Sequence, residues 1–279
     1  MSKALTLTIV IPVYNEESYI HDCLEAISKQ VIMPNEVIVV DNNSTDNTVT
    51  IAKKYDFVTV VNETRQGVRF ANEMGMDLAK SDIIARIDAD TILPTGWSKL
   101  VLDTFVDDDV PAISGPTGYY NFIYPETSKL LATNLMWFGS KIGYKFLFGC
   151  NMAIRKSVWN QIKGSLCDEK SIFEDVDLAF HMLKIGYQPR FVKEMSVLVS
   201  SRRADDRPVE FYRYIKGHTR TARHHSKRNL VPAMYAETMF MIAYLSIKPL
   251  HMVYDPVTRR FDPRRLYSIS KSRPNPMDY

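Results

Sequence analysis

Cysteine is scarce in this sequence, and long apolar runs are missing. The 279 residues include three cysteines, Cys23, Cys150 and Cys167, which form no Cys-x-x-Cys pair. An odd count is a poor disulfide framework, so we expect a reducing compartment, and the six histidines show no zinc-ligand spacing. No run of about 18 uncharged apolar residues occurs, which predicts no membrane-spanning helix. The start of the chain lacks the features of a signal peptide, so we expect a cytoplasmic protein.

A strong excess of one charge sign is also missing from the chain as a whole. The net charge is +3, too small to indicate a nucleic-acid-binding protein. Residues 1–201 hold 19 Lys and Arg against 25 Asp and Glu, a net charge of −6. Residues 202–228 hold 9 against 3, and residues 229–279 hold 7 against 4. Residues 1–201 are therefore acidic and residues 202–279 are basic. Such an asymmetry suggests that the basic segment has a function or a binding partner of its own.

Strand-like and helix-like segments alternate through the first 115 residues. Apolar runs rich in Ile and Val predict strands, and apolar residues three or four apart predict helices. The expected strands are 5–13, 36–40, 57–61, 83–87 and 110–114, and the expected helices include 17–30, 68–80 and 97–105. This alternation is typical of a mainly parallel sheet with helices on both faces. Ligands bind such sheets outside the carboxyl ends of the strands.

Acidic side chains follow several of these predicted elements. Asp88 and Asp90 stand at a strand end, where two carboxylates can hold a hard divalent cation, although a turn that happens to contain two Asp residues is the simpler alternative. Asp41 opens a turn after the second strand and can supply turn chemistry, accept a hydrogen bond from a nucleobase, or do both. Glu174 and Asp175 begin an expected helix over 174–185. Together with Asp177 they put three acidic residues in the first turn, more than helix capping requires, so we expect a general base there.

Five short motifs follow one another in order along the chain. They are residues 9–17 (IVIPVYNEE), 40–46 (VDNNSTD), 85–91 (ARIDADT), 149–155 (GCNMAIR) and 174–178 (EDVDL). Each is weak alone. Together, in this order and at this spacing, they make the chain resemble the family-2 glycosyltransferases of the GT-A fold over roughly residues 5–205.

The resemblance implies an α/β fold, the GT-A fold, with a Rossmann-like, mainly parallel sheet flanked by helices. The charge and apolar pattern of the residues after it predicts a basic helical C-terminal extension. We expect a GT-A catalytic domain over 1–205, with a nucleotide-binding half (1–115) and an acceptor or catalytic half (116–205). A basic helix over 208–225 and an apolar helix over 232–254 would form the extension, 206–254. Residues 255–279 are expected to be loosely ordered.

The resemblance also implies a nucleoside-diphosphate sugar as donor, usually a UDP- or GDP-sugar. Carried over by position, Pro12, Tyr14, Glu16 and Asp41 would line the nucleoside pocket. Asn151 would lie near the donor or acceptor sugar.

A divalent metal, Mn or Mg, is implied as the cofactor. Asp88 and Asp90 would form the D-x-D pair, with Asp90 the more direct metal ligand, and His218 is a further candidate ligand. Asp175 would be the catalytic base, with Glu174 beside it.

The sequence departs from the family pattern at one place near the expected donor site, where an arginine is missing. Asn72 and Glu73 stand where the family commonly has Arg and Asn. Arg69, one helical turn earlier, is a candidate substitute for the lost guanidinium. Arg202 and Arg203 follow the last predicted strand and either contact the diphosphate or belong to a solvated basic surface.

The mechanism expected from these residues is direct displacement with inversion at the anomeric carbon. A base is needed for a hydroxyl acceptor but not for a phosphate, which favours a hydroxyl on a glycan or glycolipid. Two alternatives remain: a non-catalytic nucleotide-sugar-binding module, and a haloacid-dehalogenase-like phosphatase, whose nucleophile motif the Asp88–Ile92 segment resembles. A sugar-nucleotide pyrophosphorylase is disfavoured, because no glycine-rich phosphate loop follows the first strand.

The basic region carries Arg213, Lys216, Arg220, Arg223 and Lys227 at three- or four-residue steps. This helical face is either solvated or attracted to an anionic membrane surface, helped by the apolar run 239–245. No nucleic-acid-binding motif accompanies it. The protein is therefore expected in the cytoplasm, and the membrane alternative predicts peripheral attachment at the inner face of the plasma membrane.

Overall fold

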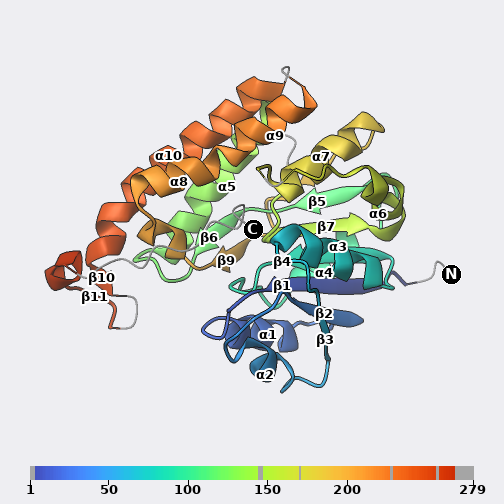
Figure 1. Ribbon diagram of the computed structural model, residues 1–279, viewed down its shortest axis with the longest axis horizontal. Coiled ribbons are helices and arrows are strands. Elements are labelled where there is room, and N and C mark those ends of the chain that lie inside the picture. Colours follow the sequence, from blue (N-terminus) through green and yellow to red (C-terminus); the bar gives the residue numbers. More distant parts are fainter. Residues whose placement is uncertain (1–3, 144–146, 170, 227–228, 256–257, 268–279) are drawn as a thin grey trace.

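A seven-stranded sheet organises the N-terminal two thirds of the chain (Figure 1). The computed structural model describes residues 4–143, 147–169, 171–226, 229–255 and 258–267. The strand order is β3 (Val58–Asn62), β2 (Glu36–Asp41), β1 (Leu7–Val13), β4 (Ile83–Ile87), β7 (Asn151–Arg155), β5 (Ala112–Ser114) and β8 (Arg190–Phe191). The first four strands are parallel, β7 runs antiparallel between β4 and β5, and β8 is parallel to β5. The expected mainly parallel α/β sheet is confirmed.

Helices cover both faces of this sheet because its central strands are apolar on both sides. The core on one face joins α1 (Ile20–Ser28), α2 (Thr48–Ala52) and α4 (Trp97–Thr104) to Leu7, Ile9 and Ile11 of β1. The core on the other face joins α3 (Val68–Leu78), α6 (Lys156–Ile162) and α7 (Glu174–Lys184) to Val10. Burial of each such side chain contributes about 1.5–3 kcal/mol. Helix α3 lies so near β1 that a Cβ on Gly75 would come within 2.3 Å of Val10 Cγ1.

The chain connections open a crevice at the carboxyl ends of the central strands. From β1 the chain passes through α1 to β2, whereas from β3 it passes through α3 to β4 on the other side of β1. Val13 at the end of β1 pairs with Asp41 at the end of β2, and Asp88 follows the last residue of β4. The motifs at these strand ends therefore meet at the edge where open α/β sheets bind ligands.

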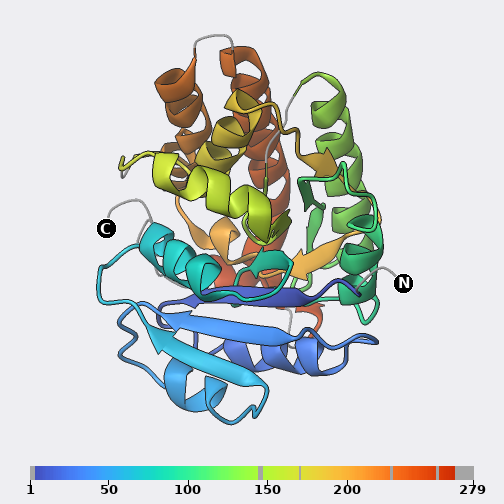
Figure 2. The ribbon, with the colours of Figure 1, turned by 90° about the vertical axis from the view of Figure 1, so that its right-hand side faces the viewer.

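A helical layer lies at the opposite end of the molecule from α1 and α2 (Figure 1, Figure 2). It consists of α5 (Pro125–Lys141), α8 (Pro208–Ile215), α9 (Gly217–His225) and α10 (Leu230–Val253). Beside α5, β6 (Thr117–Tyr119) pairs in parallel with β9 (Val197–Val199). The sequence did not predict α5, because exposed Leu130, Leu131 and Phe138 blur the apolar face that would mark it.

The C-terminal third differs from the sequence-based expectation in two details. The basic helix expected over 208–225 is two helices, α8 and α9, that meet at Lys216. Lys227 lies outside the described residues. Loose order was expected from residue 255 onward, yet β10 (Tyr254–Asp255) and β11 (Arg260–Phe261) form an antiparallel pair, followed by a 3-10 helix over Pro263–Tyr267. Residues 268–279 also lie outside the described residues.

Helix α10 is long and apolar enough to cross a membrane, which the sequence analysis did not anticipate. It has 24 residues, and 28% of its most apolar window, with a mean hydropathy of 1.4, is buried. The buried face includes Glu237, which accepts a hydrogen bond from the Thr219 backbone N–H at 3.0 Å and pairs with Lys216 at 3.4 Å. The helix thus packs on α9 through a paired carboxylate, and its length and composition alone are weak evidence for a membrane span.

Candidate active site

A cavity of about 590 Å³ lies at the carboxyl ends of β1 and β4. Its walls come from the loop after β1, from α3, from the loop after β4, from residues 148–152, and from α7, α8 and α9. Most of the sequence-predicted site residues line it, namely Pro12, Tyr14, Glu16, Arg69, Asp88, Asp90, Glu174, Asp175, Arg202, Arg203 and His218. Motifs from both halves of the chain therefore share one space.

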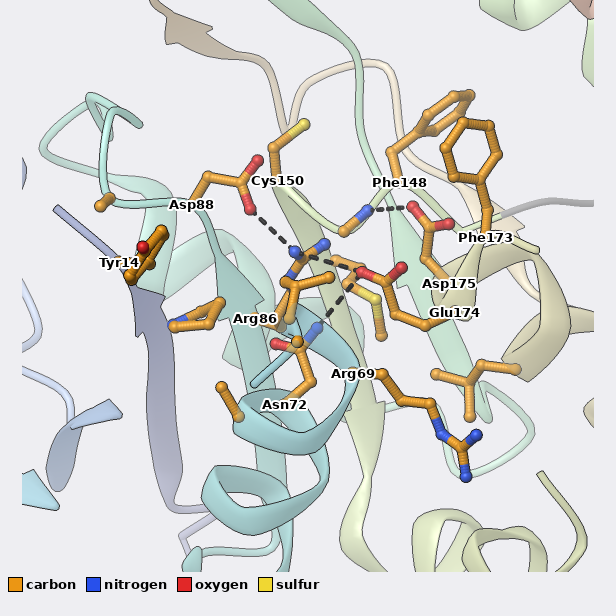
Figure 3. A pocket seen from close by; sticks show the side chains of 18 of the residues that line it. Tyr14, Arg69, Asn72, Arg86, Asp88, Phe148, Cys150, Phe173, Glu174 and Asp175 are labelled. Atoms are coloured by element: carbon orange, nitrogen blue, oxygen red, sulfur yellow. Dashed lines mark hydrogen bonds and ion pairs between the residues drawn. The ribbon is translucent and has the colours of Figure 1, made fainter. Parts of the chain in front are cut away.

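Arg86, which the sequence analysis did not single out, joins the two acidic motifs (Figure 3). Its Nη2 lies 2.9 Å from Asp88 Oδ1 and 3.4 Å from Glu174 Oε1. Burial lowers the pKa of Arg86, but Asp88 and Glu174 outweigh that effect and raise the pKa above its ordinary value. A Cβ at Gly149 would fall 1.1 Å from Arg86 Nη1, so a larger residue there would displace the guanidinium from this position. The sequence does contain a signal for Arg86: it is the one charged residue in an apolar strand that is buried throughout. A buried arginine requires an acidic partner.

Glu174 and Asp175 form a carboxylate pair in the first turn of α7. Asp175 Oδ2 accepts a hydrogen bond from the Gly149 backbone N–H at 2.7 Å, and its Oδ1 accepts one from Val176 N–H at 2.8 Å. Burial raises the pKa of both carboxyl groups, Arg86 opposes this shift, and the pKa of Glu174 rises to about 7. The Glu174 side chain keeps 23% exposure, which faces the cavity. Enclosed carboxylates of raised proton affinity are suited to accepting a proton near neutral pH.

Arg202 connects the loop after β1 to the loop after β4. It belongs to the 3-10 helix Arg202–Asp205, and its Nη1 and Nη2 lie 2.5 and 2.9 Å from the Glu16 carboxylate oxygens. Its Nε lies 2.9 Å from Asp90 Oδ2. The guanidinium also stacks 4.5 Å from the centroid of the Tyr19 ring. A fixed cation between two buried carboxylates can exchange these partners for phosphate oxygens, whose geometry a guanidinium fork matches.

The departure from the family pattern on α3 produces its own contacts. Asn72 Nδ2 donates to Glu174 Oε1 at 3.3 Å, and Asn72 Oδ1 is buried without a hydrogen-bond partner among the described residues. Glu73 Oε1 accepts from Arg69 Nε at 2.7 Å, while Arg69 Nη1 donates to Asp168 at 2.7 Å. Arg69 borders the cavity but points away from Arg86 and Asp88 (Figure 3). In this structure its guanidinium is committed to two carboxylates at the rim.

The turn after β2 is held by its own polar side chains. Asp41 is buried, and its carboxylate accepts hydrogen bonds from Ser44 N–H at 3.1 Å and Asn62 Nδ2 at 3.1 Å. Asn15 is in the left-handed region, with φ 55°, and its Oδ1 accepts from Thr45 N–H at 2.8 Å. The turn chemistry expected for Asp41 is therefore present, and it fixes this turn against the loop after β1.

Asn151 has a packing role instead of the sugar contact expected from the resemblance. Its side chain is fully buried. Its Oδ1 accepts from Trp97 Nε1 at 3.0 Å, and its Nδ2 donates to the carbonyls of Pro116 and Met195 at 3.1 and 2.5 Å. With both amide protons engaged and no exposed surface, the Asn151 side chain does not line the cavity and offers no group to a ligand.

Arg203 and His218 border the cavity through aromatic contacts. The Arg203 guanidinium lies 4.2 Å from the Tyr214 ring centroid and pairs with Asp206 at 3.3 Å. The His218 ring stacks on Phe240 at 5.3 Å and meets the edge of Phe173 at 4.8 Å. Burial lowers the pKa of His218 to about 3, so the imidazole is neutral. Both side chains thus sit on aromatic supports at the wall formed by α8 and α9.

Comparison with known proteins identifies the class to which this fold and site belong. The model described as "Glycosyl transferase family 2" matches residues 8–162, more than half of the chain. The chain belongs to glycosyl transferase family 2. The phosphatase alternative is thereby excluded, in keeping with the position of Asp88 after the fourth strand of the sheet instead of the first.

Several curated relatives carry glycosyltransferase names. The chain is 27% identical over 210 residues to the O-antigen chain rhamnosyltransferase RfbN of Salmonella typhimurium, which covers 69% of this chain and 66% of that protein. It is 30% identical over 212 residues to the probable glycosyltransferase YdaM of Bacillus subtilis, covering 68% and 50%. It is 31% identical over 121 residues to glycosyltransferase GlyG of Streptococcus pneumoniae, covering 42% and 40%. The matches thus span less than two thirds of each relative.

Two solved structures share the fold. The mannosyltransferase PcManGT from Pyrobaculum calidifontis, in complex with GDP-Man and Mn2+, superposes with a TM-score of 0.63 at 20% identity, covering 90% of this chain and 74% of that one. TarS of S. aureus superposes with a TM-score of 0.55 at 14% identity, covering 88% and 55%. At these identities the likeness concerns the GT-A fold alone.

Proposed function

We propose that this protein transfers a sugar from a nucleoside-diphosphate donor to a hydroxyl group of a glycan or glycolipid, with inversion at the anomeric carbon. The observation that carries the proposal is the shared cavity, whose walls include the Asp88/Asp90 pair, the Glu174/Asp175 pair and Arg202. Such a displacement needs positive charge at the leaving diphosphate and a proton acceptor at the attacking hydroxyl. Both kinds of group border this space.

The donor is proposed to be a UDP- or GDP-sugar bound beside the loop after β1. Pro12 and Tyr14 border the cavity there. Asp41 does not line it but holds the Ser44 N–H, and the Ser44 hydroxyl accepts a hydrogen bond from Asn15 N–H in the loop after β1. Arg202, already between Glu16 and Asp90, is the proposed diphosphate contact. The GDP-Man in the PcManGT complex is consistent with this class of donor. Arg69 would reach the donor only by leaving Glu73 and Asp168.

Asp88 and Asp90 fit a hard divalent cation such as Mn2+ or Mg2+, because carboxylate oxygens are the ligands that these ions prefer. When bound, the cation would neutralise charge on the leaving diphosphate. The chain's own guanidinium groups contribute at the same place, since Arg86 pairs with Asp88 and Arg202 with Asp90. His218 borders the same cavity and is proposed as a further ligand.

Asp175 is the proposed proton acceptor, and Glu174 is its positioning neighbour. Backbone N–H groups hold both Asp175 oxygens, which fixes the orientation of the carboxylate. Arg86 and Asn72 hold Glu174. A phosphate acceptor would arrive as an anion and need no base, so this pair favours a hydroxyl acceptor.

The helical layer provides the proposed contact with an anionic membrane surface in the cell interior. Trp137 and Phe138 on α5 and Ile242 and Leu245 on α10 are exposed. The two helices touch through Tyr235, whose hydroxyl donates to the Leu135 carbonyl at 3.3 Å. Arg213, Arg220 and Arg223 are exposed on the neighbouring α8 and α9. Apolar side chains beside exposed basic ones are typical of peripheral membrane attachment.

A donor screen by thermal unfolding tests the central proposal. UDP-, GDP- and dTDP-sugars are each added with Mn2+, Mg2+ or EDTA. We expect one nucleotide to raise the midpoint in a metal-dependent way, since a ligand at about 100 times its Kd adds about 2.7 kcal/mol of stability. Asp88→Asn with Asp90→Asn should abolish the metal dependence.

The control for this screen is Arg190→Met, which breaks an exposed ion pair with Asp107 far from the cavity walls. It should respond to donor as the wild type does. No midpoint rise with any nucleotide contradicts the proposal. A rise without sugar transfer to any glycan or glycolipid acceptor would indicate the non-catalytic nucleotide-sugar-binding module.

A further inference from the structure

Four metal-ligating side chains converge where α7, α9 and the segment before α7 meet. Cys167 lies in that segment, Asp177 and His181 stand one turn apart on α7, and His225 is the last residue of α9. Their ligand atoms all lie within 4.8 Å of one another. We propose that Cys167, Asp177, His181 and His225 form a structural zinc site, separate from the cation site proposed at Asp88 and Asp90.

Three separations between the ligand atoms are close to those of a tetrahedral zinc shell. Zinc bonds of about 2.0–2.3 Å hold neighbouring ligand atoms about 3.3–3.8 Å apart. Cys167 Sγ lies 3.4 Å from His181 Nε2 and 3.9 Å from His225 Nε2, and His181 Nε2 lies 3.6 Å from Asp177 Oδ1. The 2.6 Å hydrogen bond between His225 Nε2 and Asp177 Oδ1 is shorter than these separations, and zinc bonds to both atoms would replace it.

The chemistry of the four ligands selects zinc over the harder ions. One thiolate and two imidazoles suit zinc, whereas Mn2+ and Mg2+ favour oxygen. A thiolate and a carboxylate also neutralise the double charge of the ion, which suits a site where the Asp177 and His225 side chains are 4% and 2% exposed.

Neighbouring groups already orient two of the ligands, His181 and Asp177. The Ser165 hydroxyl lies 3.0 Å from His181 Nδ1, which leaves Nε2 for the ion, and the Cys167 backbone N–H donates to Asp177 Oδ2 at 3.0 Å. Cys167 and Asp177 also border the main cavity, which provides a path by which the ion can enter.

Zinc at this place would link α9 to α7, the helix that carries the proposed base Asp175. Asp177 stands two residues after Asp175 on α7, and His225 ends α9. The segment that carries Cys167 continues into Asp168, which holds Arg69 at the cavity rim. The inference does not rest on the proposed sugar transfer, because its ligands take no part in that reaction.

Metal analysis of the full chain tests the site. After dialysis against metal-free buffer, elemental analysis should find about one zinc per chain. Cobalt substitution should produce a thiolate-to-cobalt charge-transfer absorption. Cys167→Ser should abolish that absorption, and His225→Gln should lose the zinc. Ser165→Ala should weaken zinc binding by about 10- to 100-fold.

Two controls separate this site from its surroundings. His224→Gln, at the exposed neighbouring position, should keep the zinc. The Asp88→Asn and Asp90→Asn double variant should also keep it, whatever happens to donor binding. Loss of zinc from that double variant, with retention in Cys167→Ser, would assign the metal to the donor site and overturn the proposal.

A chelator distinguishes a zinc site from a plain hydrogen-bonded cluster without relying on a variant that folds poorly. A chelator should lower the unfolding midpoint of the wild type and leave that of His225→Gln unchanged. A wild-type chain that retains no zinc, gives no cobalt charge-transfer band and keeps its midpoint in chelator would overturn the proposal.

Discussion

Replacing Arg86 with methionine should be the most damaging single change in the cavity wall. The substitution keeps a long apolar stem but removes the charge that lies 2.9 Å from Asp88 and 3.4 Å from Glu174. Removing one partner of a buried ion pair costs about 3–5 kcal/mol. Because the Asp88 side chain is 40% exposed and that of Glu174 is 23% exposed, water compensates part of the loss. We therefore expect about 3 kcal/mol, or a midpoint about 6 °C lower.

The loss should depend on pH. Burial raises the pKa of Glu174 and Asp175, and Arg86 opposes that shift, so its removal raises both values further. Carboxyl groups whose pKa is raised in the native state bind more protons there than in the unfolded chain. Stability then falls as pH rises between the unfolded and native pKa values. The deficit of Arg86→Met should therefore be smaller near pH 5 than near pH 8.

Thermal and urea unfolding of Arg86→Met, Glu174→Gln and the double variant measure these effects. Arg190→Met is the matched control, because it removes an arginine from an exposed pair and should cost less than about 1 kcal/mol. In the double variant the lost carboxylate should restore about 0.5–3 kcal/mol of the deficit. An Arg86→Met protein as stable as Arg190→Met, or a deficit independent of pH, would refute the reasoning.

Three further outcomes are expected. Asp175→Asn should lower the rate of sugar transfer by about 10²–10⁴-fold while the donor still raises the unfolding midpoint, and unchanged turnover would reassign the base. Asn151→Ala should cost about 1–3 kcal/mol by leaving buried groups unpaired, with donor affinity unchanged; altered affinity with normal stability would return Asn151 to the site. Charge reversal at Arg213, Arg220 and Arg223 should reduce salt-sensitive sedimentation with anionic vesicles, and a wild type that ignores such vesicles would end the membrane proposal.

The positions of the strand-end motifs could be predicted from the sequence because they depend on local patterns. Alternation of apolar strands and amphipathic helices defines the sheet, and a parallel sheet puts the residues after β1, β2 and β4 at one edge. The sequence therefore predicts that Asp41, Asp88 and Asp90 lie in a single region. The core followed for the same reason, since Ile9 and Ile11 lie in a run that is apolar on both faces.

The roles of side chains whose partners are distant in the sequence could not be predicted from it. Asn151 occurs in a family motif, yet its role follows from Trp97, Pro116 and Met195, which no spacing relates to it. Helix α5 was missed because part of its apolar surface is exposed, which removes the periodic signal. The histidines showed no zinc-ligand pattern because His225 approaches Asp177 from 48 residues away.

Local sequence thus defined the fold class of this protein: a mainly parallel α/β sheet with carboxylates at the edge where such sheets bind ligands. The tertiary structure decided which side chains meet, through the pairing of β4 with β7 and the packing of α7, α8 and α9 near these strands. They bring Arg86 to Glu174, Cys167 to His225, and Arg202 to Glu16, which lies 186 residues earlier in the chain. Backbone propensity and hydrophobic period act over one or two turns or strands. Charge pairing and metal ligation act across space, so their partners are chosen only when the elements pack.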